Sequence, residues 1–194
     1  MESSITKEII STLEQETFAG RIITIQLLSE AKKAVKYLSK YSMIGFDTET
    51  RPSYKKGLRY SVSLIQLATE DTCFLFRLNM IGFPQCLIDL LSNPDVKKIG
   101  LSLRDDFAVM NRRQVFTPDG FIDLQKIVPK YGITDISLQK VYAILFNKKI
   151  SKNQRLTNWE ADILTDSQKK YAATDAWACL KIYNKLHGKI IFTP

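Results

Sequence analysis

Short apolar runs alternate with amphipathic helical patterns along most of this chain. Runs of this kind predict strands, and patterns with apolar residues three and four apart predict helices. We expect strands at 21–25, at a run ending near Asp47, and at 61–68, 72–76, 96–101 and 120–123. We expect helices at 4–17, at 29–39, up to about Leu91, around Asp106, and at 124–131, 137–146 and 165–187. The alternation predicts an α/β fold, a mixed central sheet flanked by helices on both sides, with an antiparallel meander across a Glu70-Asp71 turn.

Length and composition favour one domain. With 194 residues, 45% hydrophobic and 25% charged, the chain is long enough to bury a substantial core. No repeat interrupts it, and the only linker-like stretch, 147–156, is too short to separate domains. We therefore predict a single domain over 1–194, with 1–20 as an N-terminal helical extension.

Composition also excludes several classes of protein. No apolar run approaches the roughly 20 residues that span a bilayer, and the N-terminus lacks a basic start and an apolar signal core, so we expect a cytoplasmic protein. Cys73, Cys86 and Cys179 are predicted to be free buried thiols. The single histidine, His187, is expected near a helix end, which argues against histidine-based nucleases and Ser-His hydrolases.

Two acids stand where the first central strand meets a polar loop, in the segment 44–50. Alternate side chains of a strand share a face, so Asp47 and Glu49 are expected to point together while Phe46 and Thr48 point the other way. Adjacent carboxylates repel each other unless they are protonated or bridged by a cation. A metal site and a solvated strand end are both compatible with this pair alone.

Two further acidic sites lie on expected helices. Asp105 and Asp106 open a helix after a buried-looking strand, where either could simply satisfy free amide groups of the first turn. Tyr171 and Asp175 are four residues apart and therefore share a helix face. In isolation, that second pair also fits a half-buried tyrosine beside an exposed aspartate.

Taken in order, these acids resemble the 3′-5′ exonucleases of the DEDD superfamily, in the tyrosine-bearing subgroup. The similarity runs from about Ile22 to Leu186 and includes the hairpin region 58–68, the Lys98-Ile99-Gly100 strand end and the Asn158-Trp159 pair. The resemblance implies a ribonuclease H-like fold with its acids at strand ends. It also implies hydrolysis of phosphodiester bonds at a 3′ end by two divalent ions, Mg²⁺ or Mn²⁺, with release of nucleoside 5′-monophosphates.

The resemblance also implies a role for each acid. Asp47 would bridge both ions, Glu49 and Asp175 would complete the nucleophile-side site, and Asp106 would hold the leaving-group ion through water. Asp106 matches the third acid better than Asp105, counting six residues from Gly100. The Tyr171 hydroxyl would orient the attacking water. The implied substrate-binding residues are Thr48, Lys152, Arg155 and Asn158.

A net charge of +8 indicates a polyanionic partner, because the expected site is itself acidic. Basic tracks flank the motifs, and we predict modest processivity on single-stranded 3′ ends or overhangs. Tyr54 and Tyr60 could stack on a base or support the hairpin. Two other functions stay open, a nucleic-acid-binding module with little turnover and a structural domain that recruits partners. DNA and RNA are equally compatible with the sequence. The basic residues of the tracks are Arg51, Lys55, Lys56, Arg59, Lys148, Lys149, Lys152 and Arg155.

Overall fold

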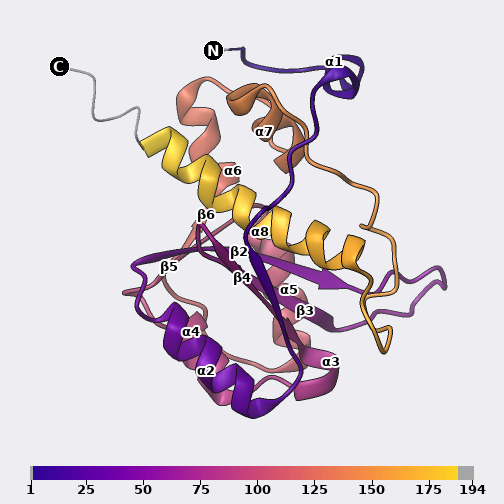
Figure 1. The fold of residues 1–194 in the computed structure, drawn as a ribbon, viewed down its shortest axis with the longest axis vertical. Helices are drawn as coiled ribbons and strands as arrows, with labels where there is room; N and C mark the ends of the chain where they lie inside the picture. Colours follow the sequence, from indigo (N-terminus) through magenta and orange to yellow (C-terminus); the bar gives the residue numbers. More distant parts are fainter. Residues whose placement is uncertain (1, 188–194) are drawn as a thin grey trace.

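The computed structural model describes residues 2–187 and shows a six-stranded sheet between two layers of helices (Figure 1). In chain order the elements are α1 (Lys7–Thr12), β1 (Arg21–Ile25), α2 (Leu28–Leu38), β2 (Met43–Thr50), β3 (Val62–Ala68), β4 (Thr72–Arg77), α3 (Leu78–Ile81), α4 (Gln85–Leu91), β5 (Lys97–Gly100), α5 (Leu103–Arg113), β6 (Phe121–Asp123), α6 (Leu124–Ile127), the 3-10 turn η1 (Val128–Tyr131), α7 (Leu138–Phe146) and α8 (Asp166–His187).

The sheet has the order β1-β4-β3-β2-β5-β6. Strands β2, β3 and β4 form the predicted antiparallel meander. Strand β1 pairs parallel to β4, and β5 and β6 extend the other side of the sheet in parallel with β2. The mixed sheet with helices on both faces confirms the predicted architecture.

Two cores lie on opposite faces of the sheet. Helices α2, α4 and α5 pack on one face, against side chains such as Ile44 and Phe46 of β2. Helix α8 covers the other face and crosses the middle of the sheet, and α7 packs against α8 (Figure 1). Every residue of β3 and β4 is buried, because strands covered on both faces have no solvent side.

The prediction of a helix over 4–17 is correct only for Lys7–Thr12, the helical part of this segment. The chain then runs extended across α8 towards β1 (Figure 1). Phe18 is buried, and its N–H donates to Thr174 Oγ1 at 3.0 Å. Glu16 pairs with Lys181 at 2.8 Å. These long-range contacts replace the helical hydrogen bonds that the local pattern predicted.

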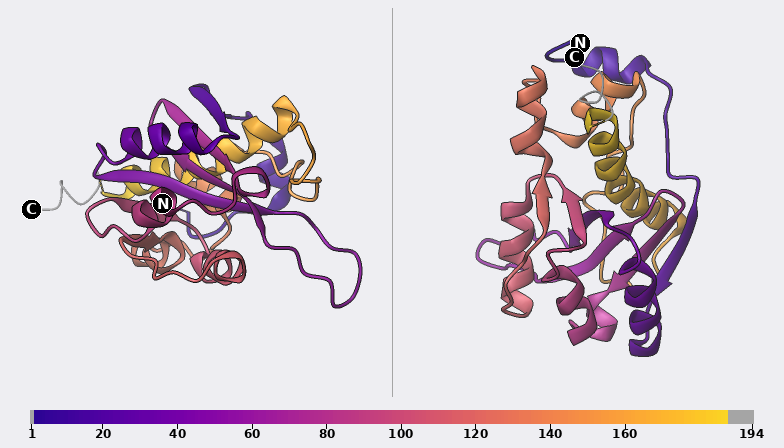
Figure 2. Two further views of the ribbon diagram at one scale, coloured as in Figure 1. Left: turned by 90° about the horizontal axis from the view of Figure 1, so that it is seen from below. Right: turned by 90° about the vertical axis from the view of Figure 1, so that its left-hand side faces the viewer.

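Strand β2 also differs from the prediction, because it continues three residues past Asp47. Its pairing with β3 extends from Gly45 opposite Ala68 to Thr50 opposite Val62, with an irregularity after Glu49. The acid pair therefore lies within the strand, on backbone held by β3, and not at the strand end. The loop that follows, 51–61, projects from the body of the molecule (Figure 2).

The three cysteines are free, as predicted, although Cys86 is only half-buried while Cys73 and Cys179 are buried. Within residues 2–187 no helix is both long and apolar enough to span a membrane.

Candidate active site

Three carboxylates converge between β2 and α8. One oxygen each from Asp47, Glu49 and Asp175 lies within 4.8 Å of the others. Glu49 and Asp175 are 8% and 7% exposed, and all three line a pocket of about 410 Å³. Oxygen ligands gathered in this way suit a hard divalent cation such as Mg²⁺ or Mn²⁺.

A glycine on β2 lets α8 come close enough to bring Asp175 to this cluster. Gly45 shares a strand face with Asp47 and Glu49, since alternate residues point the same way. A Cβ on Gly45 would lie 2.0 Å from the carbonyl oxygen of Ala176. Only a residue without a side chain permits this approach between strand and helix.

The fourth acid comes from the first turn of α5. Asp106 is half-buried and accepts a hydrogen bond from Thr48 Oγ1 at 2.5 Å, whereas Asp105 is exposed. Thr48 does lie on the opposite face of β2 from Asp47, and its contact with Asp106 shows that it helps to position this acid. Asp106 is not one of the three clustered carboxylates and does not line their pocket, but burial and then the charge of Asp106 raise the pKa of Asp47. It is therefore the acid of this turn that lies near the cluster.

Asp123, at the end of β6, holds the turn that presents Asp106. Its carboxylate accepts hydrogen bonds from the backbone N–H groups of Ser102 at 3.1 Å and Leu103 at 3.2 Å. Ser102 has a left-handed φ of 65°, a conformation that few non-glycine residues adopt without support. The sequence alone does not reveal this role of Asp123, because only the parallel pairing of β5 with β6 places it beside α5.

Asp106→Asn is expected to lower turnover at least about 100-fold, whereas Asp105→Asn changes it less than about threefold. Both replacements remove one negative charge from the same helical turn, so each serves as the matched control for the other. Steady-state rates on a labelled oligonucleotide measure the difference. Equal losses in the two variants would contradict the assignment.

Tyr171 lies one helical turn before Asp175 and is 9% exposed. Its ring packs near Trp159, with the centroids 6.0 Å apart. Burial and the neighbouring carboxylates raise the pKa of the phenol far above its usual value. The hydroxyl is therefore protonated at neutral pH, where it can orient a water molecule or a phosphate oxygen.

The acids are held in an environment that disfavours their charged forms. Burial, followed by repulsion from neighbouring carboxylates, raises the pKa of Asp47 and of Glu49 well above the usual values. Burial raises the pKa of Asp106 to about 6, partly offset by the Thr48 hydrogen bond. It raises the pKa of Asp175 to about 7, against the opposing effects of Tyr171 and Lys152. A divalent cation would relieve this repulsion.

The metal-free protein is expected to lose stability as the pH rises from about 4 to about 8. The site carboxyls have higher pKa values folded than unfolded, so the folded state binds more protons in this window and loses that advantage at higher pH. Melting temperatures in chelator at pH 5 and pH 8 measure the effect. A change of about 2 kcal/mol corresponds to roughly 4–8 °C for a chain of this size.

Asp175→Asn is the comparison that isolates the site from other titrating groups. It removes one buried charge, so the variant should melt above the wild type at pH 8 in chelator, by a margin that shrinks at pH 5. Adding Mg²⁺ or Mn²⁺ at pH 8 should raise the melting temperature of the wild type more than that of the variant. A margin independent of pH would contradict the assignment.

The loop between α7 and α8, residues 147–165, supplies the basic side of the pocket. Lys152 and Arg155 line the pocket with the acids. Asn158 does not reach it, because it lines a separate hollow beside the 51–60 loop. The structure thus brings two of the three predicted substrate-binding residues of this loop to the acids and leaves Asn158 apart.

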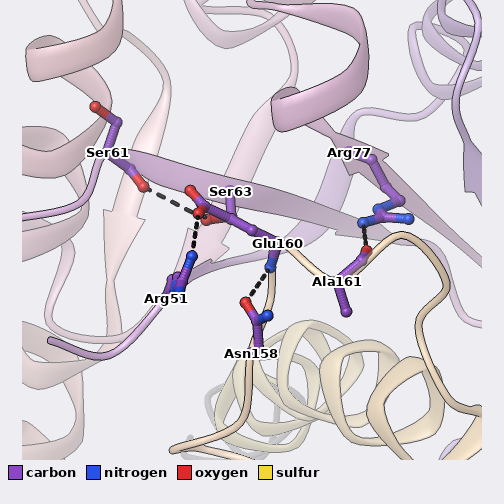
Figure 3. A network of polar contacts seen from close by, with 7 residues as sticks. All are labelled: Arg51, Ser61, Ser63, Arg77, Asn158, Glu160 and Ala161. Atoms are coloured by element: carbon purple, nitrogen blue, oxygen red, sulfur yellow. Dashed lines mark hydrogen bonds and ion pairs between the residues drawn. The ribbon is translucent and has the colours of Figure 1, made fainter.

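Polar contacts fix the C-terminal part of this loop to the sheet (Figure 3). Glu160 accepts hydrogen bonds from Arg51 and from Ser63, both at 3.4 Å. The Glu160 N–H donates to Asn158 Oδ1 at 3.0 Å, so the side chain of Asn158 shapes the loop. Fully buried Arg77 at the end of β4 donates to the backbone carbonyl of Ala161 (Figure 3).

The two tyrosines after β2 also contact their neighbours. Tyr60 lies beneath the Arg51 guanidinium, 4.8 Å from ring centroid to Cζ. Tyr54 is 83% exposed, and its hydroxyl lies 3.5 Å from the carbonyl oxygen of Leu156. Tyr60 thus supports the start of the loop, while the face of Tyr54 is open to solvent.

Comparison with known proteins decides the family. A family model for 3′-5′ exonucleases matches residues 22–191. The chain belongs to this exonuclease family. The mouse bifunctional 3′-5′ exonuclease/ATP-dependent helicase WRN is 37% identical over 155 residues, which are 77% of this chain and 11% of that protein. The chain spans less than two thirds of the length of the curated relatives it matches.

Solved structures of exonucleases share the fold. The Nibbler exonuclease domain of Aedes aegypti superposes with a TM-score of 0.83 at 20% identity, over 91% of this chain and 93% of that one. The RNase D of Trypanosoma brucei in complex with RNA U12 gives a TM-score of 0.76 at 20% identity, over 88% of this chain and 64% of that one. These similarities confirm the predicted ribonuclease H-like fold.

Proposed function

We propose that this exonuclease-family domain hydrolyses phosphodiester bonds at the 3′ end of DNA or RNA and releases nucleoside 5′-monophosphates. The convergence of Asp47, Glu49 and Asp175 within 4.8 Å carries the proposal, with Asp106 beside them. Carboxylates this close repel each other and a phosphate alike, so the arrangement is useful when divalent cations bind it.

The proposed roles follow from position. Asp47, Glu49 and Asp175 form the oxygen set that would hold a divalent cation, and Asp106 would contribute to a second. Two such ions, Mg²⁺ or Mn²⁺, would supply a water of lowered pKa and would neutralise the charge on the departing oxyanion. The protonated Tyr171 hydroxyl orients the attacking water, because its raised pKa makes it a poor base.

The basic wall of the pocket supports a nucleic-acid substrate. Lys152 and Arg155 line the same pocket as the acids. Against the burial that raises them, the charges of these two residues lower the pKa of Asp175 and of Glu49 respectively, so both are available to contact substrate phosphates. The net charge of +8 favours approach of a polyanion. The structurally similar Trypanosoma brucei RNase D in complex with RNA makes single-stranded RNA a reasonable substrate to test beside DNA.

A nucleic-acid-binding module without turnover is the second candidate, and the acids argue against it. A surface that only binds phosphates gains nothing from three carboxylates in its pocket, because they reduce affinity for an anion in the absence of metal. The intact set of acids and tyrosine therefore favours the enzyme.

Purified protein should be incubated with 5′-labelled single-stranded DNA and RNA, in the presence of Mg²⁺, Mn²⁺ or chelator. We expect a metal-dependent ladder that shortens from the 3′ end and is absent with Asp47→Ala. The ratio of the degradation rates of DNA and RNA shows whether the protein prefers deoxyribose or ribose. If the substrate stays intact under every metal condition while binding is still measurable, the proposal of an enzyme is wrong and that of a nucleic-acid-binding module is supported.

A further inference from the structure

A second hollow adjoins the acid pocket. It has a volume of about 560 Å³ and lies between α1, the start of α7 and residues 149–153. Four residues line both hollows, so the two share one wall: Gln139, Ile150, Ser151 and Lys152. A chain that leaves the acid pocket on this side must pass over the second hollow, here named the lysine groove.

The lysine groove is strongly basic. Lys7, Lys140, Lys149 and Lys152 line it, and none of the lining residues, all within 2–187, is acidic. Lys140 is paired with Asp135 at 2.7 Å. Within the described residues Lys7 and Lys152 form no ion pair, so their charges are available to a ligand.

The lysines lie close enough to repel one another. The pKa of Lys152 is lowered by burial and then by the positive charges of Arg155, Lys7 and Lys140, against the opposing charge of Asp175. An anion in the groove would offset this repulsion. Phosphate groups have the required charge, and lysine binds them as a point charge.

Contacts to the body of the protein hold α1 in place at the groove. The Ile5 N–H donates to Asp135 Oδ2 at 2.9 Å, and Ile10 is buried against α7. Lys149 Nζ donates to the Ser11 carbonyl at 2.5 Å. Lys7 is therefore fixed at the rim, although it lies outside residues 22–191 that match the family.

We propose that the lysine groove binds the sugar-phosphate backbone of the strand whose 3′ end occupies the acid pocket. The groove therefore extends the substrate site of the proposed exonuclease and rests on that function. No aromatic residue of the described chain lines it, so it lacks the stacking surfaces that contact bases. Binding there is independent of sequence and sensitive to salt.

The test is the affinity for a labelled 12-nucleotide single strand, measured by fluorescence anisotropy in chelator at several salt concentrations. Lys7→Ser with Lys149→Ser, with folding verified by circular dichroism because Lys149 also contacts the Ser11 carbonyl, should weaken binding roughly 10- to 30-fold at 0.1 M salt. It should also reduce the slope of log K against log salt by about 1.4, since each lost phosphate contact on a single strand contributes about 0.7. The arginine pair, Lys7→Arg with Lys149→Arg, should restore both.

Lys33→Ser with Lys36→Ser is the matched control. These exposed lysines lie on α2, across the sheet from α8, and their loss changes the net charge equally. The control should bind within about twofold of the wild type. Equal affinity of the wild type and the Lys7/Lys149 variant, or no binding by the wild type, would overturn the proposal.

Affinity and cleavage measured on the same protein distinguish this proposal from the proposed function. Binding that depends on the groove lysines, without a metal-dependent ladder, would support the proposed groove and contradict the proposed exonuclease activity. A normal ladder, together with unchanged affinity in the Lys7/Lys149 variant, would contradict the proposed groove and support the proposed exonuclease activity.

Discussion

Asp47→Asn and Asp175→Asn are each expected to lower turnover by at least about 10³-fold while the protein remains folded. Either change removes a carboxylate from the cluster that would hold divalent ions, and even outer contacts of a metal site contribute about 10- to 100-fold. The amide keeps the shape of the side chain, so packing between β2 and α8 is preserved.

Rates should be measured on a single-stranded oligonucleotide at saturating Mn²⁺ or Mg²⁺, with circular dichroism to verify folding. Asp95→Asn is the matched control, because it removes the same charge from an exposed turn. The control should retain full activity. Cleavage by Asp47→Asn or Asp175→Asn at more than a tenth of the wild-type rate would remove these residues from the metal assignment.

Gly45→Ala is expected to have the second-largest effect, although the residue does not line the acid pocket. Its Cβ would lie 2.0 Å from the carbonyl oxygen of Ala176 and 3.2 Å from Leu180 Cβ. The first contact is with backbone, so α8 must move away from the sheet and carry Asp175 with it. Overpacking of this kind costs about 1–3 kcal/mol, and displacement of a catalytic group by about 1 Å lowers rates about 100-fold.

The measurements are the urea midpoint and the turnover number, the latter at a temperature where the variant is folded. Gly82→Ala is the control for the general effect of replacing glycine. Gly82 has a φ of 69°, and a Cβ there would meet nothing within 4 Å. Because its ψ of −153° lies in a region that essentially only glycine occupies, this variant should lose about 1–3 kcal/mol of stability and keep its turnover. Normal turnover in Gly45→Ala would show that the close approach does not position the acid.

Local patterns were sufficient to predict most of the sheet and helices, because those patterns depend on which side of each element is buried. The antiparallel meander and the long C-terminal helix are both confirmed. The prediction of the N-terminal helix was wrong for residues 13–20, because these residues contact residues more than 100 positions away instead of forming helical hydrogen bonds. Phe18, which donates to Thr174, is an example. No local pattern contains that information.

The candidate site likewise contains residues that the sequence reveals and residues that only the structure reveals. The order of Asp47, Glu49, Tyr171 and Asp175 could be read from the sequence, since strand and helix spacing determine which of them share a face. Asp123, Glu160 and the closeness of α8 to Gly45 could not be read, because each depends on pairing between distant segments. Asn158 shows the reverse case, in which a residue of the family pattern shapes its own loop instead of lining the acid pocket.

The extended segment before β1 bears on where this domain can be cut. Family similarity begins at residue 22, yet Phe18 fills the core beside Trp177 of α8, and Glu16 holds both Lys181 and the Tyr142 hydroxyl. A protein trimmed to the family boundary would expose an aromatic cavity and leave the Lys181 ammonium without its carboxylate. We therefore expect a stably folded version of this domain to need the extended segment, which contributes to the scaffold as much as the strands do.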